Sequence, residues 1–374
     1  MKRVRSTPRL DWQRRVEALG LTWHTPDEGP YWDEAAYYAL TVADVAALKA
    51  ASEACYEMFL ALGDRVVRDR LFARFGIPDW CADLVADAWN AEPPALNFGR
   101  FDFALDGSGP PKLLEFNCDT PTSLLEAAVI QWDWKEAVFP QAGQCNEIHE
   151  CLIEKWQDIK PYLPGYGVHF VCGRDVLGED IMTTTYLRET AEAAGIKTRV
   201  LLIGEVGWDR IRHRFVDLSN DEMRVVFKLY PWEWMLRESF GRNLLDKTTL
   251  WIEPLWKLMW SNKCVLPLLW EMFPDHPNLL PAWDTRPPVD CVAKPSFGRE
   301  GRGVTFLSAG DPLPMLEDSL GRMIFQKRIA IEPFDGQVPI IGSWMVDGYH
   351  AGIGIREGGP ITNNNSRFAP HIVI

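Results

Sequence analysis

Four polar residues in one short stretch carry groups that could do chemistry together. They are Arg100, Asp102, Glu115 and Asn117, within the segment RFDFALDGSGPPKLLEFN. Two strand-like runs, 100–105 and 112–117, flank a turn rich in Gly, Pro and Ser. This pattern is typical of a β-hairpin.

A symmetric pairing of the two strands predicts which residues face each other. The predicted pairs are Arg100–Asn117, Asp102–Glu115 and Leu105–Lys112. Because side chains alternate between the two faces of a strand, the four polar residues then share one face. The opposite, apolar face suits a core and holds Phe101, Phe103, Leu114 and Phe116. A slip of one residue in register would scatter both sets.

The polar face of this hairpin is a candidate metal and phosphate site. The oxygens of Asp102, Glu115 and Asn117 are hard ligands that suit Mg²⁺ bound together with phosphates. Arg100 suits a phosphoryl or acyl-phosphate oxygen. The alternative is a solvated hairpin face with an ordinary cross-strand ion pair, since charged hairpins are common. The spacing of the residues fits both interpretations equally.

A glycine-rich segment near the C-terminus is a second candidate phosphate site. The run SFGREGRG, residues 296–303, follows a predicted strand that ends in Lys294-Pro295. A glycine-rich turn between two strands can place backbone N–H groups over phosphates, and a preceding lysine can reach them. The segment is neither a Walker A loop, which needs GxxxxGK[ST] before a helix, nor a dinucleotide-binding fingerprint.

Three further residues stand near predicted helix N-termini. Thr122 and Ser123 open a helix that runs to about residue 139, where free N–H groups and hydroxyls can hold an anion. Either residue could instead be the N-cap. Glu233 begins another helix and can contact an amine, although a first-turn glutamate also interacts favourably with the helix dipole. A polar cluster near the C-terminus is also predicted to line the site: Arg356, Asn365, Ser366 and His371.

Composition limits the partners of the chain. The formal net charge is −13, which argues against a general nucleic-acid or anionic-membrane surface but allows a local basic pocket. The eight cysteines are scattered without a CxxC pair, and no signal peptide or apolar membrane-spanning run stands out. We therefore expect reduced thiols and a cytoplasmic location, without a nucleic-acid or membrane partner. The oligomeric state, monomer or homodimer, stays open.

The 374 residues exceed what one hydrophobic core usually serves, so two or three lobes are expected. Residues 1–95 are predicted to be a helical region, with helices over 33–40, 41–63 and 65–75 and stops at glycines. Residues 96–235 hold the hairpin and a strand–helix–strand alternation over 167–172, 179–194, 198–203 and 225–229, which favours a parallel α/β layer. Residues 236–374 begin with a helical stretch, 250–273, and then become strand-rich, over 289–294, 304–308, 323–326, 337–344 and 349–355. The predicted fold class is mixed α/β.

Taken together and in order, these motifs resemble the synthetase part of the glutathionylspermidine synthase family. The matching segments are FDF…LLEFNCDTPTSLLEA, FKLYPWEWM, SNK, VAKPSFGREGRGV, GSWMVDG…GIGIRE and ITNNNSRFAPH, across about residues 98–371. The resemblance implies a pre-ATP-grasp lobe plus ATP-grasp lobes. The chain leaves no room for an amidase domain, so no Cys/His hydrolase half is expected, and Cys118 is not expected to be a nucleophile.

The resemblance also implies roles for particular residues. It makes Asp102, Glu115 and Asn117 ligands of two Mg²⁺ ions and Arg100 the group that stabilises acyl-phosphate and tetrahedral species. Arg356 matches a phosphate-side arginine. The implied nucleotide contacts are Lys263, Lys294, Gly298, Arg299, Glu300, Gly301 and Gln326. The implied substrate contacts are Thr122 and Ser123 for the acid and Glu233 for the amine.

The implied activity is ATP-dependent ligation of a carboxylic acid to an amine through an acyl phosphate. The acid implied is the glycine carboxylate of glutathione or of a similar peptide, and the amine is a polyamine such as spermidine. Two alternatives stay open: a non-catalytic nucleotide-binding protein on the same fold, and an ATP-dependent phosphotransferase. Retention of Asp102, Glu115, Asn117, Lys263 and Lys294 argues against the first.

Overall fold

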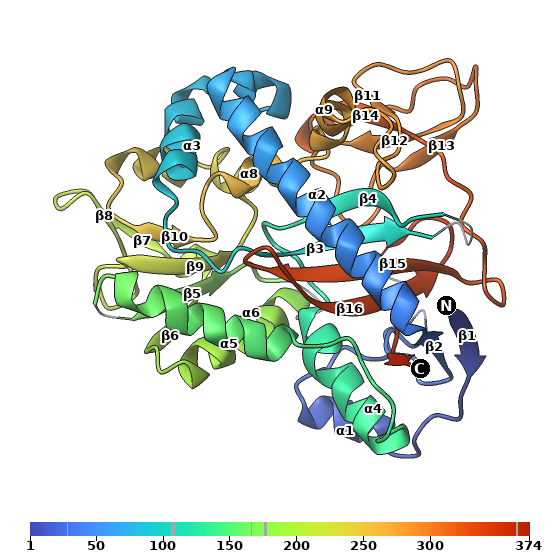
Figure 1. Ribbon diagram of the computed structural model, residues 1–374. Coiled ribbons are helices and arrows are strands. Elements are labelled where there is room, and N and C mark those ends of the chain that lie inside the picture. The colour runs from blue at the N-terminus through green and yellow to red at the C-terminus, as the bar shows by residue number, and fades with distance from the viewer. Residues whose placement is uncertain (28, 106–108, 166, 176–177, 364–365) are drawn as a thin grey trace.

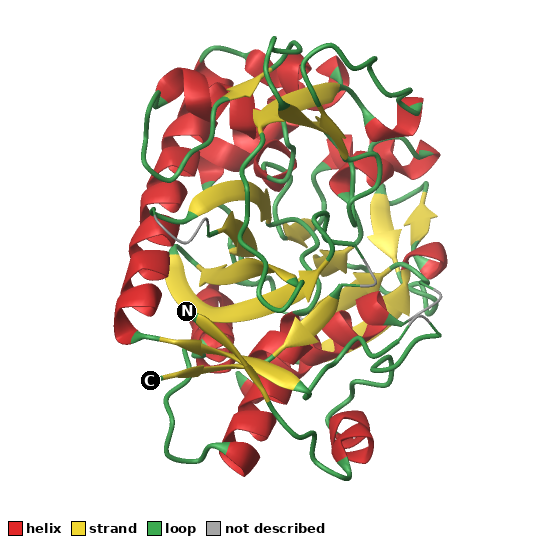
Figure 2. Ribbon diagram, turned by 90° about the vertical axis from the view of Figure 1, so that its right-hand side faces the viewer, coloured by secondary structure: helices red, strands yellow, loops and turns green. Residues whose placement is uncertain are grey.

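The computed structural model describes residues 1–27, 29–105, 109–165, 167–175, 178–363 and 366–374 (Figure 1). It is a mixed α/β structure, as predicted, with most strands in the middle of the molecule and most helices towards its outside (Figure 2). Residues 106–108 of the predicted hairpin turn and Asn365 of the C-terminal polar cluster lie outside the described residues. Within those residues, no helix is both long and apolar enough to cross a membrane.

The sheet that carries the polar hairpin is five-stranded and antiparallel. Its spatial order is β17 (Arg367–Ala369), β16 (Tyr349–Gly358), β15 (Val338–Val346), β3 (Phe98–Ala104) and β4 (Lys112–Asn117). β3 therefore pairs on one side with its hairpin partner β4 and on the other with β15, from the C-terminal part of the chain. The sheet joins strands from both sides of the boundary predicted at 235/236.

The hairpin register matches the prediction at its polar end and departs from it towards the turn. The predicted pairs Arg100–Asn117 and Asp102–Glu115 are confirmed. The predicted pair Leu105–Lys112 is wrong, because the register shifts after Asp102 and Lys112 lies opposite Ala104. Such a bulge reverses the faces of the residues beyond it. Leu113 accordingly takes the core position predicted for Leu114, and Leu114 lines a pocket.

The long helix α2 (Val42–Arg68) crosses the central sheet in Figure 1. A capping box between Thr41 and Asp44 marks its start. The predicted stop at Gly63 is wrong: a Cβ there would lie 2.2 Å from the ring of Trp89, so this glycine allows close packing of α3 (Asp79–Ala91). The predicted helix over 65–75 is instead the end of α2 followed by a 3-10 turn, η1 (Leu71–Phe75).

A second sheet is four-stranded and parallel, which confirms the predicted α/β layer. Its order is β10 (Leu250–Ile252), β9 (Val225–Leu229), β5 (Val168–Cys172) and β6 (Thr198–Leu202). The helices beside it are α5 (Ile148–Ile159) and α6 (Glu179–Ala193) (Figure 1). A small hairpin follows, formed by β7 (Gly207–Asp209) and β8 (Arg214–Val216). The helix predicted over 250–273 is wrong at its start, where β10 pairs with β9.

A third, antiparallel sheet carries the glycine-rich segment between two of its strands. Its order is β11 (Ala282–Trp283), β14 (Met323–Lys327), β12 (Cys291–Pro295) and β13 (Thr305–Leu307). The short helix α7 (Trp232–Met235) lies on the chain between β9 and β10, and the short helices α8 (Lys257–Trp260) and α9 (Val265–Met272) lie between the second and third sheets. The residues between β12 and β13 reach back towards the hairpin, as described below.

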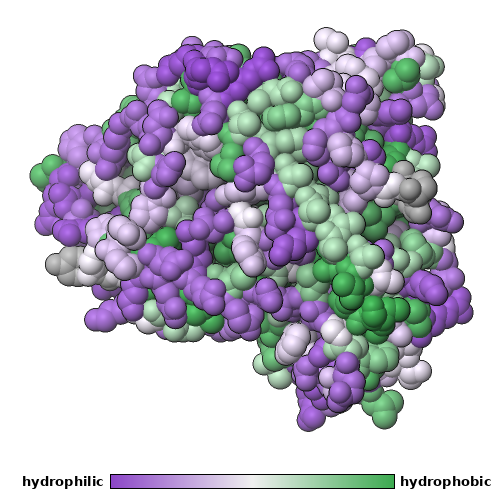
Figure 3. All heavy atoms as spheres, viewed as in Figure 1, coloured by the Kyte–Doolittle hydropathy of each residue, from purple (hydrophilic) through white to green (hydrophobic). Residues whose placement is uncertain are grey.

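The two ends of the chain meet in a three-stranded sheet, β1 (Lys2–Arg5), β2 (Ala36–Leu40) and β18 (His371–Val373). The helix predicted over 33–40 is therefore wrong, because β2 pairs with strands from both termini. The helix α1 (Trp12–Ala18) lies between β1 and β2 in the chain. Figure 3 shows that the most continuous hydrophobic surface of this face lies near the termini, where Val42 and Ile374 are exposed.

Candidate active site

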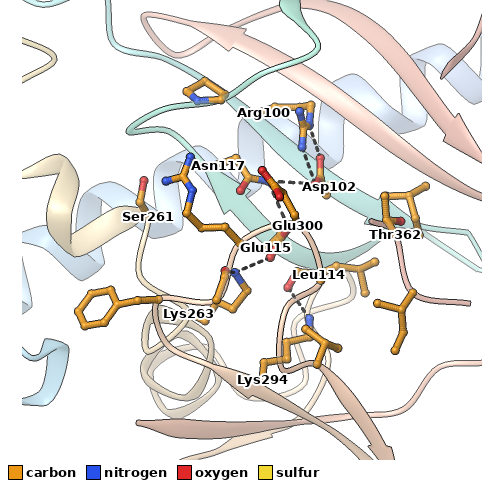
Figure 4. A pocket seen from close by; sticks show the side chains of 18 of the residues that line it. Arg100, Asp102, Leu114, Glu115, Asn117, Ser261, Lys263, Lys294, Glu300 and Thr362 are labelled. Carbon is orange, nitrogen blue, oxygen red and sulfur yellow. Dashed lines mark hydrogen bonds and ion pairs between the residues drawn. The ribbon is translucent and has the colours of Figure 1, made fainter. Parts of the chain in front are cut away.

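A pocket of about 220 Å³ lies where the central sheet, the third sheet and the glycine-rich segment meet (Figure 4). Most of the predicted site residues line it: Arg100, Asp102, Glu115, Asn117, Thr122, Glu233, Lys263, Lys294, Gly298, Arg299, Glu300, Gly301, Gln326 and Arg356. Ser123, Ser366 and His371 do not. The structure thus gathers residues from four parts of the chain around one space.

The polar face of the β3–β4 hairpin forms one wall of this pocket. Arg100 makes a two-point contact with Asp102, with Nε to Oδ1 at 2.6 Å and Nη2 to Oδ2 at 3.0 Å. The amide of Asn117 donates to Asp102 at 2.9 Å and to Glu115 at 3.3 Å. Four side chains on one face are therefore already organised by each other, as the register predicts.

Two buried lysines face this wall from other elements. The Nζ of Lys263 lies 2.9 Å from Oε2 of Glu115 and donates to the carbonyl oxygen of Gly298 at 2.7 Å. Lys294, on β12, donates to Oε1 of Gln326 at 2.7 Å and to the carbonyl oxygen of Leu114 at 2.9 Å. The hairpin bulge presents that carbonyl oxygen, so it helps to fix the lysine at the pocket wall.

The charges at this wall shift each other's pKa values. Burial acts to raise the pKa of Glu115, but the positive charges of Lys263 and Lys294 outweigh it and lower that pKa to about 2. Burial raises the pKa of Asp102, and Arg100 opposes the rise. Burial lowers the pKa of Lys294 to about 8, against the attraction of Glu115. Glu115 is therefore a carboxylate at neutral pH. Lys294 is cationic at pH 7, but its pKa of about 8 lies only a little above that pH.

The glycine-rich segment folds over this region. Gly301 has a φ of +72°, and a Cβ there would lie 2.6 Å from the carbonyl oxygen of Thr362, so a side chain does not fit. Glu300, next to it, points towards the hairpin residues in Figure 4. Arg299 turns the other way and donates to Oγ1 of Thr120 at 2.6 Å. The segment thus contacts two different parts of the pocket.

The other end of the pocket is acidic. Glu233 of α7 and Asp180 of α6 both line it, and so does Asp119, which follows the hairpin. Asp119 is buried: it pairs with Lys228 of β9 at 2.5 Å and accepts the backbone N–H of Trp232 at 2.9 Å. Burial raises the pKa of Glu233, and it raises the pKa of Asp180 to about 7.

Ser123 lies beside the pocket rather than in it. It lines a small adjoining cavity together with Arg100, Asp102 and Arg356, and its hydroxyl lies 2.9 Å from that of Tyr31. The expected helix starts at residue 124 and continues through a π-helical turn, η2 (Glu126–Ile130), into α4 (Gln131–Val138). Ser123 has a φ of +64°, which is not the extended backbone of an N-cap. Thr122 lines the pocket, and its carbonyl oxygen accepts from Arg100 at 2.7 Å.

Of the polar cluster predicted near the C-terminus, one member lines the pocket and two other described members do not. Arg356 lines the pocket, as predicted. His371 does not: it is fully buried, with Nδ1 2.9 Å from Gln131 and Nε2 accepting the N–H of Cys145. Ser366 is buried too, and its hydroxyl accepts the backbone N–H of Asn363.

Sequence reasoning missed several residues that line the pocket: Asp119, Thr120, Asp180, Ser261 and Thr362. For two of them the sequence offered a signal. Asp119 and Thr120 lie directly after the hairpin, inside a motif already singled out. Asp180 comes from the first turn of α6, and only the packing of that helix against the sheet brings it to the pocket.

The Mg²⁺ and ATP implied by the resemblance fit these residues. Mg²⁺ commonly binds one or two carboxylates together with phosphate oxygens. Asp102 and Glu115 supply the carboxylates, and turning the Asn117 amide end for end would present its oxygen between them. Lys263 and Lys294 face them with positive charge for phosphates. Among the described residues, no group of three or more His, Cys, Asp or Glu side chains is placed to hold a metal ion.

A wall of metal-ligand type that faces two lysines and a glycine-rich segment is an arrangement suited to phosphoryl transfer, which depends on positioning and charge neutralisation. The chain belongs to the glutathionylspermidine synthase family: the family model described as "Glutathionylspermidine synthase preATP-grasp" matches residues 3–374.

Named relatives of the chain are ligases or synthetases. A Haemophilus influenzae protein named, provisionally, an acid–amine ligase is 34% identical, with both chains fully covered. Trypanothione synthetase of Crithidia fasciculata is 28% identical over 84% of this chain, and the bifunctional glutathionylspermidine synthetase/amidase of Escherichia coli is 26% identical over 90%. The matched regions span 53% and 59% of those two longer proteins.

The fold has a solved counterpart. The apo structure of a glutathione synthetase-like effector from Globodera pallida aligns with a TM-score of 0.59, covering 98% of this chain and 97% of the effector. The sequence identity is 12%, so this similarity concerns the fold alone.

Proposed function

We propose that this chain is an ATP-dependent ligase that joins a carboxylic acid to an amine. The observation that carries the proposal is the shared pocket in which Arg100, Asp102, Glu115 and Asn117 face Lys263 and Lys294. The ligase and synthetase names of the relatives support the same reaction class. The proposed acid is the glycine carboxylate of a glutathione-like peptide, and the proposed amine is a polyamine.

ATP would supply the phosphoryl group and Mg²⁺ would neutralise phosphate charge. An oxygen of the substrate carboxylate would bond to the γ-phosphorus while the bond from that phosphorus to the ADP oxygen breaks, which gives an acyl phosphate and ADP. The amine nitrogen then forms a bond to the acyl carbon, the bond from that carbon to the phosphate oxygen breaks, and the amine loses a proton. Phosphate leaves, and an amide remains. No covalent protein nucleophile is needed, because positioning and charge neutralisation supply the catalysis.

Each wall of the pocket has a part in this reaction. Asp102, Glu115 and Asn117 would hold the metal, while Lys263 and Lys294 would hold the phosphates. Arg100 and Arg356 would neutralise charge that builds up near the acyl phosphate. Thr122 would contact the acid, and Glu233 would hold a cationic group of the amine. The glycine-rich segment would limit access of water to the acyl phosphate.

A substrate screen tests the proposal. The protein is incubated with ATP, Mg²⁺, glutathione or related peptides, and a panel of polyamines, while ADP release and product mass are followed. The expected result is ADP formation that needs both acid and amine, with a product mass equal to their sum less one water. Asp102→Ala should abolish the product. The matched control is Asp83→Ala, an exposed aspartate paired with Arg70 away from the pocket.

The same screen separates the alternatives. A phosphorylated acid or amine without any amide would identify a phosphotransferase. Nucleotide binding without turnover for any pair would favour a non-catalytic nucleotide-binding protein. Either result would contradict the proposed ligase.

A further inference from the structure

Arg299 belongs to the glycine-rich segment, yet its guanidinium lies at the acidic end of the pocket. Its Nη2 donates to Oγ1 of Thr120 at 2.6 Å. Its Cζ lies 5.9 Å from the ring centroid of Trp234, the residue after Glu233. Both contacts lie away from Lys263 and Lys294. The structure thus places the Arg299 guanidinium beside Thr120 and Trp234.

Arg299 is the counter-charge of two carboxylates there. Burial raises the pKa values of Glu233 and Asp180, and the positive charge of Arg299 opposes both rises. Among the described residues, neither carboxylate has a side-chain hydrogen bond or an ion pair within 4.0 Å. Arg299 is therefore the main opposing positive charge for both carboxylates, with a smaller contribution of Lys228 at Glu233, and its guanidinium makes no hydrogen bond to either.

The other positively charged side chain in this region, Lys228, already forms an ion pair with Asp119. Lys228 is fully buried, pairs with Asp119 at 2.5 Å, and lies over the ring of Trp232 at 4.4 Å. Asp119 uses its second oxygen for the N–H of Trp232. Asp119 and Lys228 thus neutralise each other and hold α7 in place. Glu233 and Asp180 are left facing Arg299.

We propose that Arg299 is an internal stand-in for the cationic amine: it lies at the acidic end of the pocket, and an incoming ammonium group displaces it. The inference rests on the proposed function, since it names how the amine end of that same site is filled and emptied. Arg299 is then a determinant of amine affinity. Without it, Glu233 and Asp180 lack a counter-charge and attract an external cation more strongly.

This exchange links amine binding to the glycine-rich segment. Arg299 is attached to a segment whose next residues are Glu300, which points towards the hairpin in Figure 4, and Gly301, whose backbone lies close to the carbonyl oxygen of Thr362. When an ammonium group takes over the carboxylates, the segment loses its anchor at Thr120.

The test is a binding measurement without ATP or acid, so it does not depend on turnover. Isothermal titration calorimetry measures the Kd of 1,4-diaminobutane for the full chain and for Arg299→Met, Arg299→Lys and Arg302→Met. Arg299→Met should bind the diamine about tenfold more tightly, and Arg299→Lys should stay within about twofold of the unmodified protein. Arg302 is the matched control, because it lies on the same segment and pairs with exposed Glu317 at 2.6 Å. Arg302→Met should change nothing.

Hydrogen exchange of residues 297–303 supplies a second measurement. Diamine should raise exchange in the unmodified protein, whereas in Arg299→Met exchange should be high from the start and unchanged by diamine. Equal or weaker diamine binding by Arg299→Met overturns the inference, and so does absence of binding by both proteins. If the substrate screen fails but Arg299→Met still binds the diamine tenfold more tightly, the ligase proposal is overturned and the displacement of Arg299 by an amine is retained.

Discussion

The two ends of the pocket are built in different ways. At the hairpin end, Arg100, Asp102 and Asn117 come from adjacent strands, and each charge has a partner within 3.0 Å. At the acidic end, Glu233 and Asp180 come from two separate helices and share a nearby arginine. The first end is organised before any ligand arrives. The second end keeps carboxylates ready for an external cation.

This difference suits a ligase, because its two substrates make different demands. Phosphoryl transfer depends on preorganised charge, which the hairpin end supplies. Amine binding must be reversible and follow activation of the acid, and a weakly held internal counter-ion allows that. The predictions below test whether the two ends are separable in this way.

The largest effect is expected at the hairpin. Asp102→Asn removes a charge from the proposed metal wall and leaves Arg100 without its two-point partner. We expect amide formation to fall about a thousandfold, with little change in diamine affinity. Steady-state kinetics and calorimetry check this, with Asp83→Asn as the control. A parallel loss of diamine binding would show that the two ends are not separable.

The buried Asp119–Lys228 pair, which lies beside the acidic end of the pocket, is expected to stabilise the fold. Lys228→Met leaves Asp119 buried without its cation, which should cost about 3–4 kcal/mol in the free energy of unfolding. Urea denaturation measures it. Lys247→Met breaks an exposed pair with Asp87 and should change stability by less than about 0.5 kcal/mol. Equal effects of the two substitutions would mean that the Asp119–Lys228 pair holds nothing in place.

A smaller, pH-dependent effect is expected at Lys294. Its pKa is lowered to about 8, so the side chain is cationic at pH 7 and loses its charge as the pH rises through 8. Nucleotide affinity should therefore weaken between pH 7.5 and 9. Lys294→Met should bind ATP about 30-fold more weakly at pH 7.5, with a flat pH profile. The same pH dependence in Lys294→Met would assign the titration to another group.

The smallest effect is expected at Glu233, because Asp180 would remain to attract the cationic group of the amine. Glu233→Gln should raise the KM for the amine about tenfold and leave the KM for ATP unchanged. Initial rates with each substrate varied in turn give both values. A rise in the KM for ATP instead would place Glu233 at the nucleotide end.

The contrast between the two ends also explains what the sequence could reveal. The pairs Arg100–Asn117 and Asp102–Glu115 follow from alternation within one local hairpin, and the structure confirms them. The parallel layer over residues 168–229 also follows from a local pattern, the alternation of strand-like and helix-like segments along the chain. The acidic end depends on residues 119, 180, 233 and 299, whose meeting is a matter of tertiary packing.

Local patterns also failed where distant partners decided the outcome. Residues 36–40 form a strand because β1 and β18 pair with it, and their sequence spacing gave no sign of that. Gly63 was predicted to end a helix, but Trp89 packs against it and the helix continues. The bulge that moves Leu114 from the core to the pocket wall is likewise set by the pairing of strands in the sheet, and the residue types of the hairpin do not indicate it.

The most direct test of the central claim is a crystal structure with ADP and Mn²⁺ in place of Mg²⁺, located by anomalous scattering. The account predicts metal density in contact with Asp102, Glu115 and Asn117, and the nucleotide phosphates between that wall and Lys263 and Lys294. Metal bound elsewhere, with the hairpin carboxylates still paired only with Arg100 and Lys263, would contradict it.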